Sequence, residues 1–220
     1  MKNLTYLAPI EILQGSLTTA FVLISLALGF IIISKYFTHK DRQSLYVGIT
    51  IWFLVSPYWS DAISFIMFLT TGNELDTAIN LFIARAFTAP ILIPWIIAFT
   101  DFLYKEKQKI IVRIVSIIAI TYEIIFLIIY FIDYNLIGRR RGPFVAEFAH
   151  FIGIFLMCSI IFLLTTGFLF IRESLRSDSK EIRLQGKFLL ITFIAFGIWT
   201  IIDILFKSPY GSLQWSTWIG

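Results

Sequence analysis

Long apolar runs separated by short polar turns make up most of the chain. A helix rises about 1.5 Å per residue and a bilayer's hydrocarbon core is about 30 Å thick, so about 20 apolar residues suffice to cross it. The pattern predicts six transmembrane helices, at about 12–36, 45–70, 78–103, 110–132, 148–171 and 188–206. We expect an all-α fold: a polytopic membrane helix bundle, formed as a single integral membrane domain over residues 1–220, or a seven-helix plan lacking its last helix.

The composition narrows the class of protein further. Hydrophobic residues make up 58% of the chain and charged residues 15%, whereas about a quarter of the residues in soluble domains are charged. The lipid bilayer is therefore an expected partner. The net charge of +4 does not indicate nucleic acid, because the basic residues lie in short turns where membrane topology explains them.

The basic residues indicate an orientation. Twelve belong to three alternate turns, namely Lys35, Lys40, Arg42, Lys105, Lys107, Lys109, Arg113, Arg172, Arg176, Lys180, Arg183 and Lys187. Five lie on the other side, namely Lys2, Arg139, Arg140, Arg141 and Lys207. The positive-inside rule places the larger set in the cytoplasm. We expect a multi-pass protein of the cell membrane with both termini outside, and the run 139–141 is the exception to the pattern.

One predicted span, 78–103, carries an arginine within its own length. Arg85 would cost about 2.5–3.5 kcal/mol at the centre of a lone helix, so it should face the bundle interior and have a partner. We expect Asp61 to be that partner, because helices 45–70 and 78–103 are joined by a short turn. Pro57 and Pro90 interrupt these two helices and free backbone carbonyls near the pair. Asp101, at the other end of the span, is expected to pair with Lys105.

The charged residues within the spans fall in the outer half of the predicted bundle. Two aromatic residues lie one turn before two of the acids and would form walls of the same site. The predicted ligand-binding residues are Asp61, Arg85, Glu123, Asp203, Tyr58 and Trp199. Three acids against one arginine leave negative charge for a cationic group to balance. A purely structural ion pair between Asp61 and Arg85 is the alternative.

Other chemistry has little support in the sequence. No cluster of His, Cys or carboxylate residues has metal-ligand spacing, and no Ser/His/Asp set or glycine-rich phosphate loop is present. We therefore predict neither enzymatic activity nor a cofactor. Cys158 is the single cysteine, so an intrachain disulfide cannot form.

Several stretches carry a resemblance, namely TDFLYKEKQKIIVR, ITYEIIFLIIYF and IRESLRSDSKEIRLQGKFLLITFIAFGIWTIIDIL. In the composition of their apolar segments and in the sequences of their loops, they resemble an uncharacterised group of archaeal multi-helix integral membrane proteins. The plan is more distantly similar to the seven-helix membrane input domains of sensor kinases, although no kinase domain is present here.

The expected function is that of a sensory or signal-relay membrane protein. An outward-facing polar cavity would bind a small ligand, and the basic turns would meet a cytoplasmic protein partner. A carrier for a cation or cationic solute, or a structural membrane subunit, are the alternatives. Prolines interrupt only the second and third predicted helices, which argues against a carrier built from two matched inverted halves.

Overall fold

The computed structural model describes residues 7–178 except 41 and 143, together with residues 180, 183, 184, 186–188, 190, 191, 194 and 198. The chain divides into two compact units, residues 1–163 and 164–220. The α-helices are α1 (Pro9–His39), α2 (Arg42–Leu54), α3 (Trp59–Thr71), α4 (Thr77–Arg85), α5 (Leu92–Leu103), α6 (Gln108–Ile132) and α7 (His150–Arg176). Short 3-10 helices are η1 (Ser56–Tyr58), η2 (Lys105–Lys107) and η3 (Tyr134–Leu136). Strands β1 (Gly138–Gly142) and β2 (Val145–Phe148) form an antiparallel hairpin.

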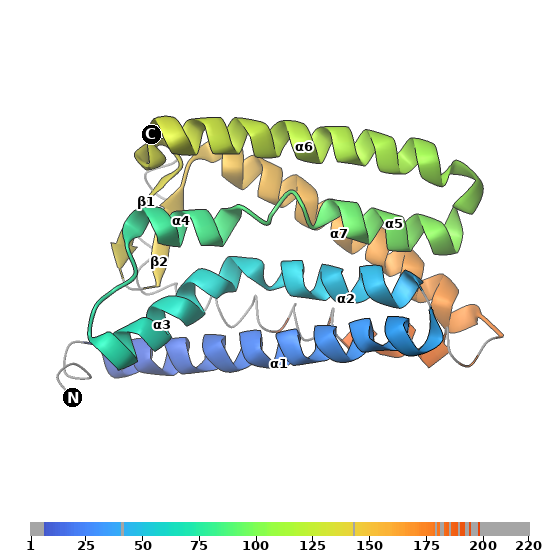
Figure 1. Cartoon of the computed structure of the whole chain (residues 1–220), viewed down its shortest axis with the longest axis horizontal. Coiled ribbons are helices and arrows are strands. Elements are labelled where there is room, and N and C mark those ends of the chain that lie inside the picture. Colours follow the sequence, from blue (N-terminus) through green and yellow to red (C-terminus); the bar gives the residue numbers. More distant parts are fainter. Residues whose placement is uncertain are drawn as a thin grey trace. The chain divides into compact units, whose positions relative to one another are not determined.

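The first unit is a row of antiparallel helices (Figure 1). Helix α1 packs on α2 and α3, α2 packs on α5, α3 on α4, and α5 on α6. The α1–α2 and α5–α6 turns lie together at one end, which we call the basic end (Figure 1). The β1–β2 hairpin and the loop 72–76 lie at the opposite end, which we call the hairpin end.

Within the described residues, four helical segments are long and apolar enough to cross a membrane, by length and composition: Pro9–Thr38, Arg42–Thr71, Lys105–Ile132 and His150–Arg176. They correspond to four of the six predicted spans, and the all-α class is confirmed. The predicted span 78–103 is instead divided between α4 and the shorter apolar helix α5. Most of the predicted span 188–206 lies outside the described residues.

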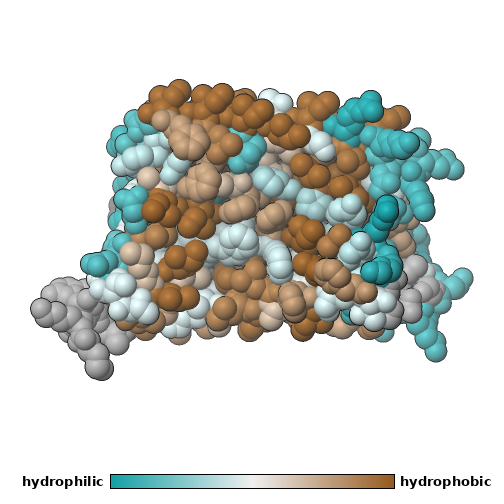
Figure 2. All heavy atoms as spheres, in the orientation of Figure 1, coloured by the Kyte–Doolittle hydropathy of each residue, from teal (hydrophilic) through white to brown (hydrophobic). Residues whose placement is uncertain are grey.

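Helix α6 exposes much of its apolar surface. Only 17% of its most apolar 18-residue stretch is buried. Figure 2 shows hydrophobic side chains gathered along this helix. In water, each fully buried large apolar side chain is worth about 1.5–3 kcal/mol relative to an exposed one. A surface of this kind is therefore typical of a helix that meets lipid or another apolar partner.

The helix Arg42–Thr71 is interrupted at Pro57. Proline has no N–H, so it cannot bond the carbonyl four residues earlier. That carbonyl, of Phe53, instead accepts a hydrogen bond from the Ser56 hydroxyl at 2.7 Å. The chain makes one 3-10 turn here, with Tyr58 N–H bonding the Val55 carbonyl at 3.0 Å, before α3 begins. The break is thus built from local hydrogen bonds.

Two glycines bring α1 and α2 into close contact. A Cβ added at Gly48 would lie 2.8 Å from the Gly29 carbonyl oxygen and 2.5 Å from Ile33. A Cβ at Gly29 would lie 2.3 Å from the Trp52 ring. The Trp52 indole N–H donates to the Leu26 carbonyl at 2.9 Å across the same interface. Neither glycine position can accept a side chain without separating the two helices.

We expect Gly48→Ala to lower the melting temperature of the purified protein. Alanine in a helix normally stabilises by about 0.5–1 kcal/mol relative to glycine, but at residue 48 it meets backbone atoms that cannot move away. Gly153→Ala in α7 is the matched control, because an added Cβ there has nothing within 4 Å. It should raise the melting temperature or leave it unchanged. Equal effects of the two substitutions would contradict the close α1–α2 contact.

Candidate functional site

Helix α4 holds Arg85 at its last turn. The Asp76 carboxylate caps the start of the helix, accepting hydrogen bonds from the backbone of Ala78 at 2.9 Å and Ile79 at 3.3 Å. The helix ends at Arg85, and residues 86–91 form turns that include Pro90. These turns have irregular hydrogen bonds, such as Thr88 N–H to the Arg85 carbonyl at 3.0 Å. Arg85 therefore lies where the helix stops.

The two helix breaks lie side by side. Phe87, within the 86–91 turns, stacks on Phe53 with ring centroids 5.6 Å apart. Its other neighbour is Trp59, at 5.2 Å. Phe53 precedes the Pro57 break and Trp59 follows it, so one aromatic side chain from the second break fits against both sides of the first. The aromatic contacts hold the breaks at one level in the bundle.

Helix α6 covers the second break. Tyr122 and Phe126 belong to a buried cluster with Ala86 and Ala89 of the turn residues. The Tyr122 ring stacks on Phe155 of α7, with centroids 3.5 Å apart. The small alanine side chains leave room for these aromatic rings against the turn. The Tyr122 hydroxyl is thereby fixed beside the end of α4.

The Arg85 guanidinium lies over an aromatic ring. Its central carbon is 3.9 Å from the centroid of Phe148, the last residue of β2, and a desolvated cation–π contact of this kind is worth about 2 kcal/mol. Among the described residues, Tyr122, Asp61 and Tyr58 lie close enough to Arg85 to interact with it electrostatically. The site thus brings together elements from α3, α4, α6 and the hairpin.

The predicted direct ion pair between Arg85 and Asp61 does not form. Among the described residues, Arg85 has no carboxylate oxygen within 4.0 Å. The reason is the end of α4: the side chain leaves the helix terminus toward Phe148 and Tyr122, and Asp61 acts on it at longer range. The two residues are near one another, as predicted, but they are not locked together.

Several buried polar atoms of this region have no hydrogen-bond partner in the described part of the chain. They are Trp59 Nε1, Arg85 Nε, Thr88 Oγ1, Tyr122 Oη and Glu123 Oε2. Buried polar groups in native proteins are nearly always bonded, to protein, ordered water or ligand. The five atoms belong to α3, α4, α6 and the intervening turn, the elements that meet at the two helix breaks. We call these five residues, with Tyr58 and Asp61, the break site.

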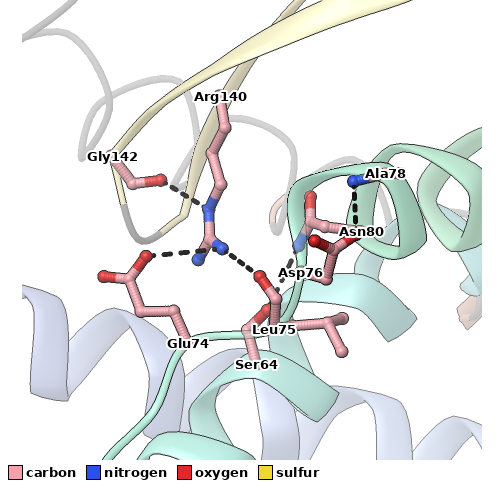
Figure 3. A network of polar contacts seen from close by, with 8 residues as sticks. All are labelled: Ser64, Glu74, Leu75, Asp76, Ala78, Asn80, Arg140 and Gly142. Carbon is pink, nitrogen blue, oxygen red and sulfur yellow. Dashed lines mark hydrogen bonds and ion pairs between the residues drawn. The ribbon is translucent and has the colours of Figure 1, made fainter. Parts of the chain in front are cut away.

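Polar contacts at the hairpin end join β1, the loop before α4 and α4 itself (Figure 3). Arg140 of β1 donates to the Leu75 carbonyl at 2.7 Å and lies 3.4 Å from the Glu74 carboxylate, with its side chain only 8% exposed. Asn80 of α4 donates to the Ser64 hydroxyl of α3 at 3.1 Å. These bonds tie the loop before α4 to the hairpin that carries Phe148.

The other predicted residues have separate positions. Glu123 follows Tyr122 on α6 and interacts electrostatically with it, whereas Trp199 and Asp203 lie outside the described residues. Asp101 makes no ion pair within 4.0 Å with Lys105 in the described structure. Helix α5 ends at Leu103 and Tyr104 has φ −137°, so the one-turn spacing that the pair requires is lost. The predicted pairing of Asp101 with Lys105 is therefore wrong.

Sequence reasoning missed three groups of the site. Tyr122 precedes Glu123 directly, but an aromatic residue on a membrane helix is usually a packing residue. Thr88 lies between Arg85 and Pro90, and its hydroxyl group, so close to a predicted helix break, could have indicated a residue of the site. Phe148 follows a stretch that reads as a loop, and only the β1–β2 pairing brings it to Arg85. No group of three or more His, Cys, Asp or Glu gathers as a metal site within the described ranges.

No family model, curated protein or solved structure matches this chain.

We expect Tyr122→Phe to leave the melting temperature unchanged or raise it. The substitution keeps the ring stacked on Phe155 and removes a hydroxyl that has no protein partner, so nothing stabilising is lost. Tyr130→Phe is the matched control on the same helix, because its hydroxyl donates to the Ala78 carbonyl at 3.2 Å. That variant should lose about 0.5–1 kcal/mol. A Tyr122→Phe variant as unstable as Tyr130→Phe would show that the Tyr122 hydroxyl has a structural role.

Proposed function

We propose that this chain is a multi-pass integral membrane protein of sensory or signal-relay type, which binds a small polar ligand at the break site. The observation that carries the proposal is the set of five buried polar atoms on the elements around two adjacent helix breaks, none of which has a hydrogen-bond partner among the described residues. A structural ion pair would satisfy its own groups. Buried polar groups without hydrogen-bond partners lower the stability of the fold. Proteins commonly retain such groups where they bind a ligand or carry out a reaction.

The chemistry of the break site favours a ligand with an amino group. The carboxyl group of Asp61 lies near the Arg85 guanidinium, and Glu123 adds a second carboxyl group beside Tyr122. Carboxylates bind ammonium groups, while the Tyr122 and Thr88 hydroxyls can either donate or accept. Arg85 would bind a carboxylate if the ligand has one. Amines and amino acids are therefore the proposed class of ligand.

The proposed topology has six crossings. Helices α4 and α5 together make one broken crossing, and residues 188–206 make the last. In a bilayer, irregular backbone is tolerated only where it is covered by protein or lines a polar site, and the 86–91 turns are covered by α6 and Phe53. Both termini lie outside in this arrangement, with the basic end in the cytoplasm, where a protein partner would meet the basic turns.

A carrier is the second candidate, and the position of the breaks favours it. Carriers for ions and small solutes often bind them where broken helices adjoin, and the Pro57 and 86–91 breaks are neighbours here. The sensory proposal is preferred because prolines interrupt only the second and third predicted helices, so the matched broken helices of an inverted-repeat carrier are not predicted. Uptake of the bound compound by liposomes that contain only this protein, lost in Arg85→Gln, would establish the carrier.

Ligand binding is tested by melting the protein in lipid nanodiscs with a panel of primary amines, amino acids and carboxylates. We expect an amine or amino acid to raise the melting temperature, because a ligand at 100 times its Kd stabilises by about 2.7 kcal/mol. Arg85→Gln and Glu123→Gln should remove the shift.

The matched controls for these variants are Arg139→Gln and Glu106→Gln, which change exposed side chains of the same types. Both should keep the full ligand-induced shift. If Arg85→Gln responds to every compound as the unsubstituted protein does, Arg85 is no part of a ligand site and the proposal is wrong.

The topology is tested by labelling single cysteines in a Cys158→Ser background. Asn73 at the hairpin end and Lys107 at the basic end are exposed, and one crossing separates them in the proposal. A membrane-impermeant maleimide applied to intact cells should label Asn73→Cys at once and Lys107→Cys only after permeabilisation. Labelling of both from the same side would mean that α4 and α5 do not cross together.

A further inference from the structure

A cavity of about 440 Å³ lies at the basic end, far along the helices from the break site. It is formed where α2 begins, α5 ends and α6 begins. Its lining residues are Arg42, Tyr46, Ile97, Asp101, Gln108, Lys109, Val112 and Arg113. Ligand pockets are typically about 300–1,000 Å³, so the cavity has the volume for a small polar group.

The lining is predominantly cationic. Arg42, Lys109 and Arg113 face one acid, Asp101. No ion pair within 4.0 Å joins Asp101 to any of the three within the described residues. Lys109 and Arg113 are four residues apart on α6 and so share one face of the helix. The cavity therefore presents positive charge that no described residue neutralises by direct contact.

Neutral polar groups complete the lining. The Gln108 amide donates to the Ile97 carbonyl at 3.3 Å, which ties the start of α6 to α5. Helix α6 begins at this residue with no side-chain cap, so the positive end of its macrodipole is at the cavity. The Tyr46 hydroxyl adds a donor from α2. Two elements, α2 and α6, thus supply groups that favour an anion.

We propose that this cavity binds a phosphate group, carried by an anionic phospholipid or by a free phosphate-containing anion. Two arginines can each bind phosphate oxygens with paired N–H groups, and a lysine adds a point charge. Basic pockets between helices at the cytoplasmic side of a membrane bind lipid head groups by this chemistry. The site differs from the break site in location, charge and ligand class.

The neighbouring surface fits the lipid source. Ile110 and Ile114, which follow Lys109 and Arg113 directly, are 64% and 54% exposed. Apolar side chains beside a cationic cavity provide contact for an acyl chain while the cavity holds the head group. A free anion would use the cavity alone.

The test titrates the detergent-purified full chain with phosphatidylglycerol, phosphatidylcholine and inorganic phosphate, with binding read by native mass spectrometry and by thermal shift. For the lipid source, phosphatidylglycerol should bind at least about tenfold more tightly than phosphatidylcholine. For the free-anion source, inorganic phosphate alone should bind. Absence of binding by both anionic probes would overturn the proposal.

The charge of the cavity is tested with matched double variants. Lys109→Gln with Arg113→Gln removes two lining charges and should weaken binding of the anionic probe by about tenfold or more. Lys105→Gln with Lys107→Gln removes two exposed charges of the same turn that do not line the cavity. That variant should change binding less than about threefold, since exposed charges are screened by salt. Equal loss in the two variants would indicate general attraction to anions and contradict the site.

Asp101→Asn should increase the affinity for an anion, a change that misfolding of the variant cannot produce. Removing the one lining acid leaves the three cations in place, so affinity for the anionic probe should rise several-fold. Glu106→Asn, on the adjacent exposed turn, is its control and should have little effect. If Asp101→Asn weakens the binding of phosphatidylglycerol and of inorganic phosphate, the cavity does not hold an anion.

Discussion

Every backbone N–H and carbonyl within an apolar bundle needs a hydrogen-bond partner, and a proline in a helix removes one such bond. The structure satisfies this requirement at two neighbouring helix breaks. At Pro57 the Ser56 hydroxyl bonds the freed Phe53 carbonyl, and around Pro90 the chain makes a series of short turns. The position of α3, the end of α4 and the direction of Arg85 all depend on these two solutions.

The breaks also explain why the polar residues do not satisfy one another. A continuous helix over residues 78–103 would direct Arg85 sideways, toward a neighbouring helix and its acids. Because α4 ends at Arg85, the guanidinium reaches the Phe148 ring instead, and Asp61 and Tyr122 influence it without a direct ion pair. The five buried polar atoms of the break site thus have no hydrogen-bond partner among the described residues, and unsatisfied buried groups lower stability.

The two ends of the first unit use basic residues differently. At the hairpin end Arg140 is buried against the Leu75 carbonyl and Glu74, and Arg141 pairs with Glu147. These two arginines of the 139–141 run therefore have structural roles. At the basic end Lys109 and Arg113 line a cavity with a single acid. Basic residues thus make contacts within the fold at one end and line a cavity at the other.

The sequence alone determined the features that depend on local composition. Apolar length predicted four segments that the structure contains as long helices, and proline predicted the two interruptions. Asp61 and Tyr58 lie near Arg85, as expected from the short turn that joins their helices. The hairpin, the Arg85–Phe148 contact, the loss of the Asp101–Lys105 pair and the basic cavity were decided only by the tertiary structure. Each of these depends on where a helix ends, to within a residue or two, and on which distant segment then lies beside it. Hydrophobic pattern specifies neither quantity, because the same apolar run is compatible with a continuous helix or a broken one until its neighbours are in place.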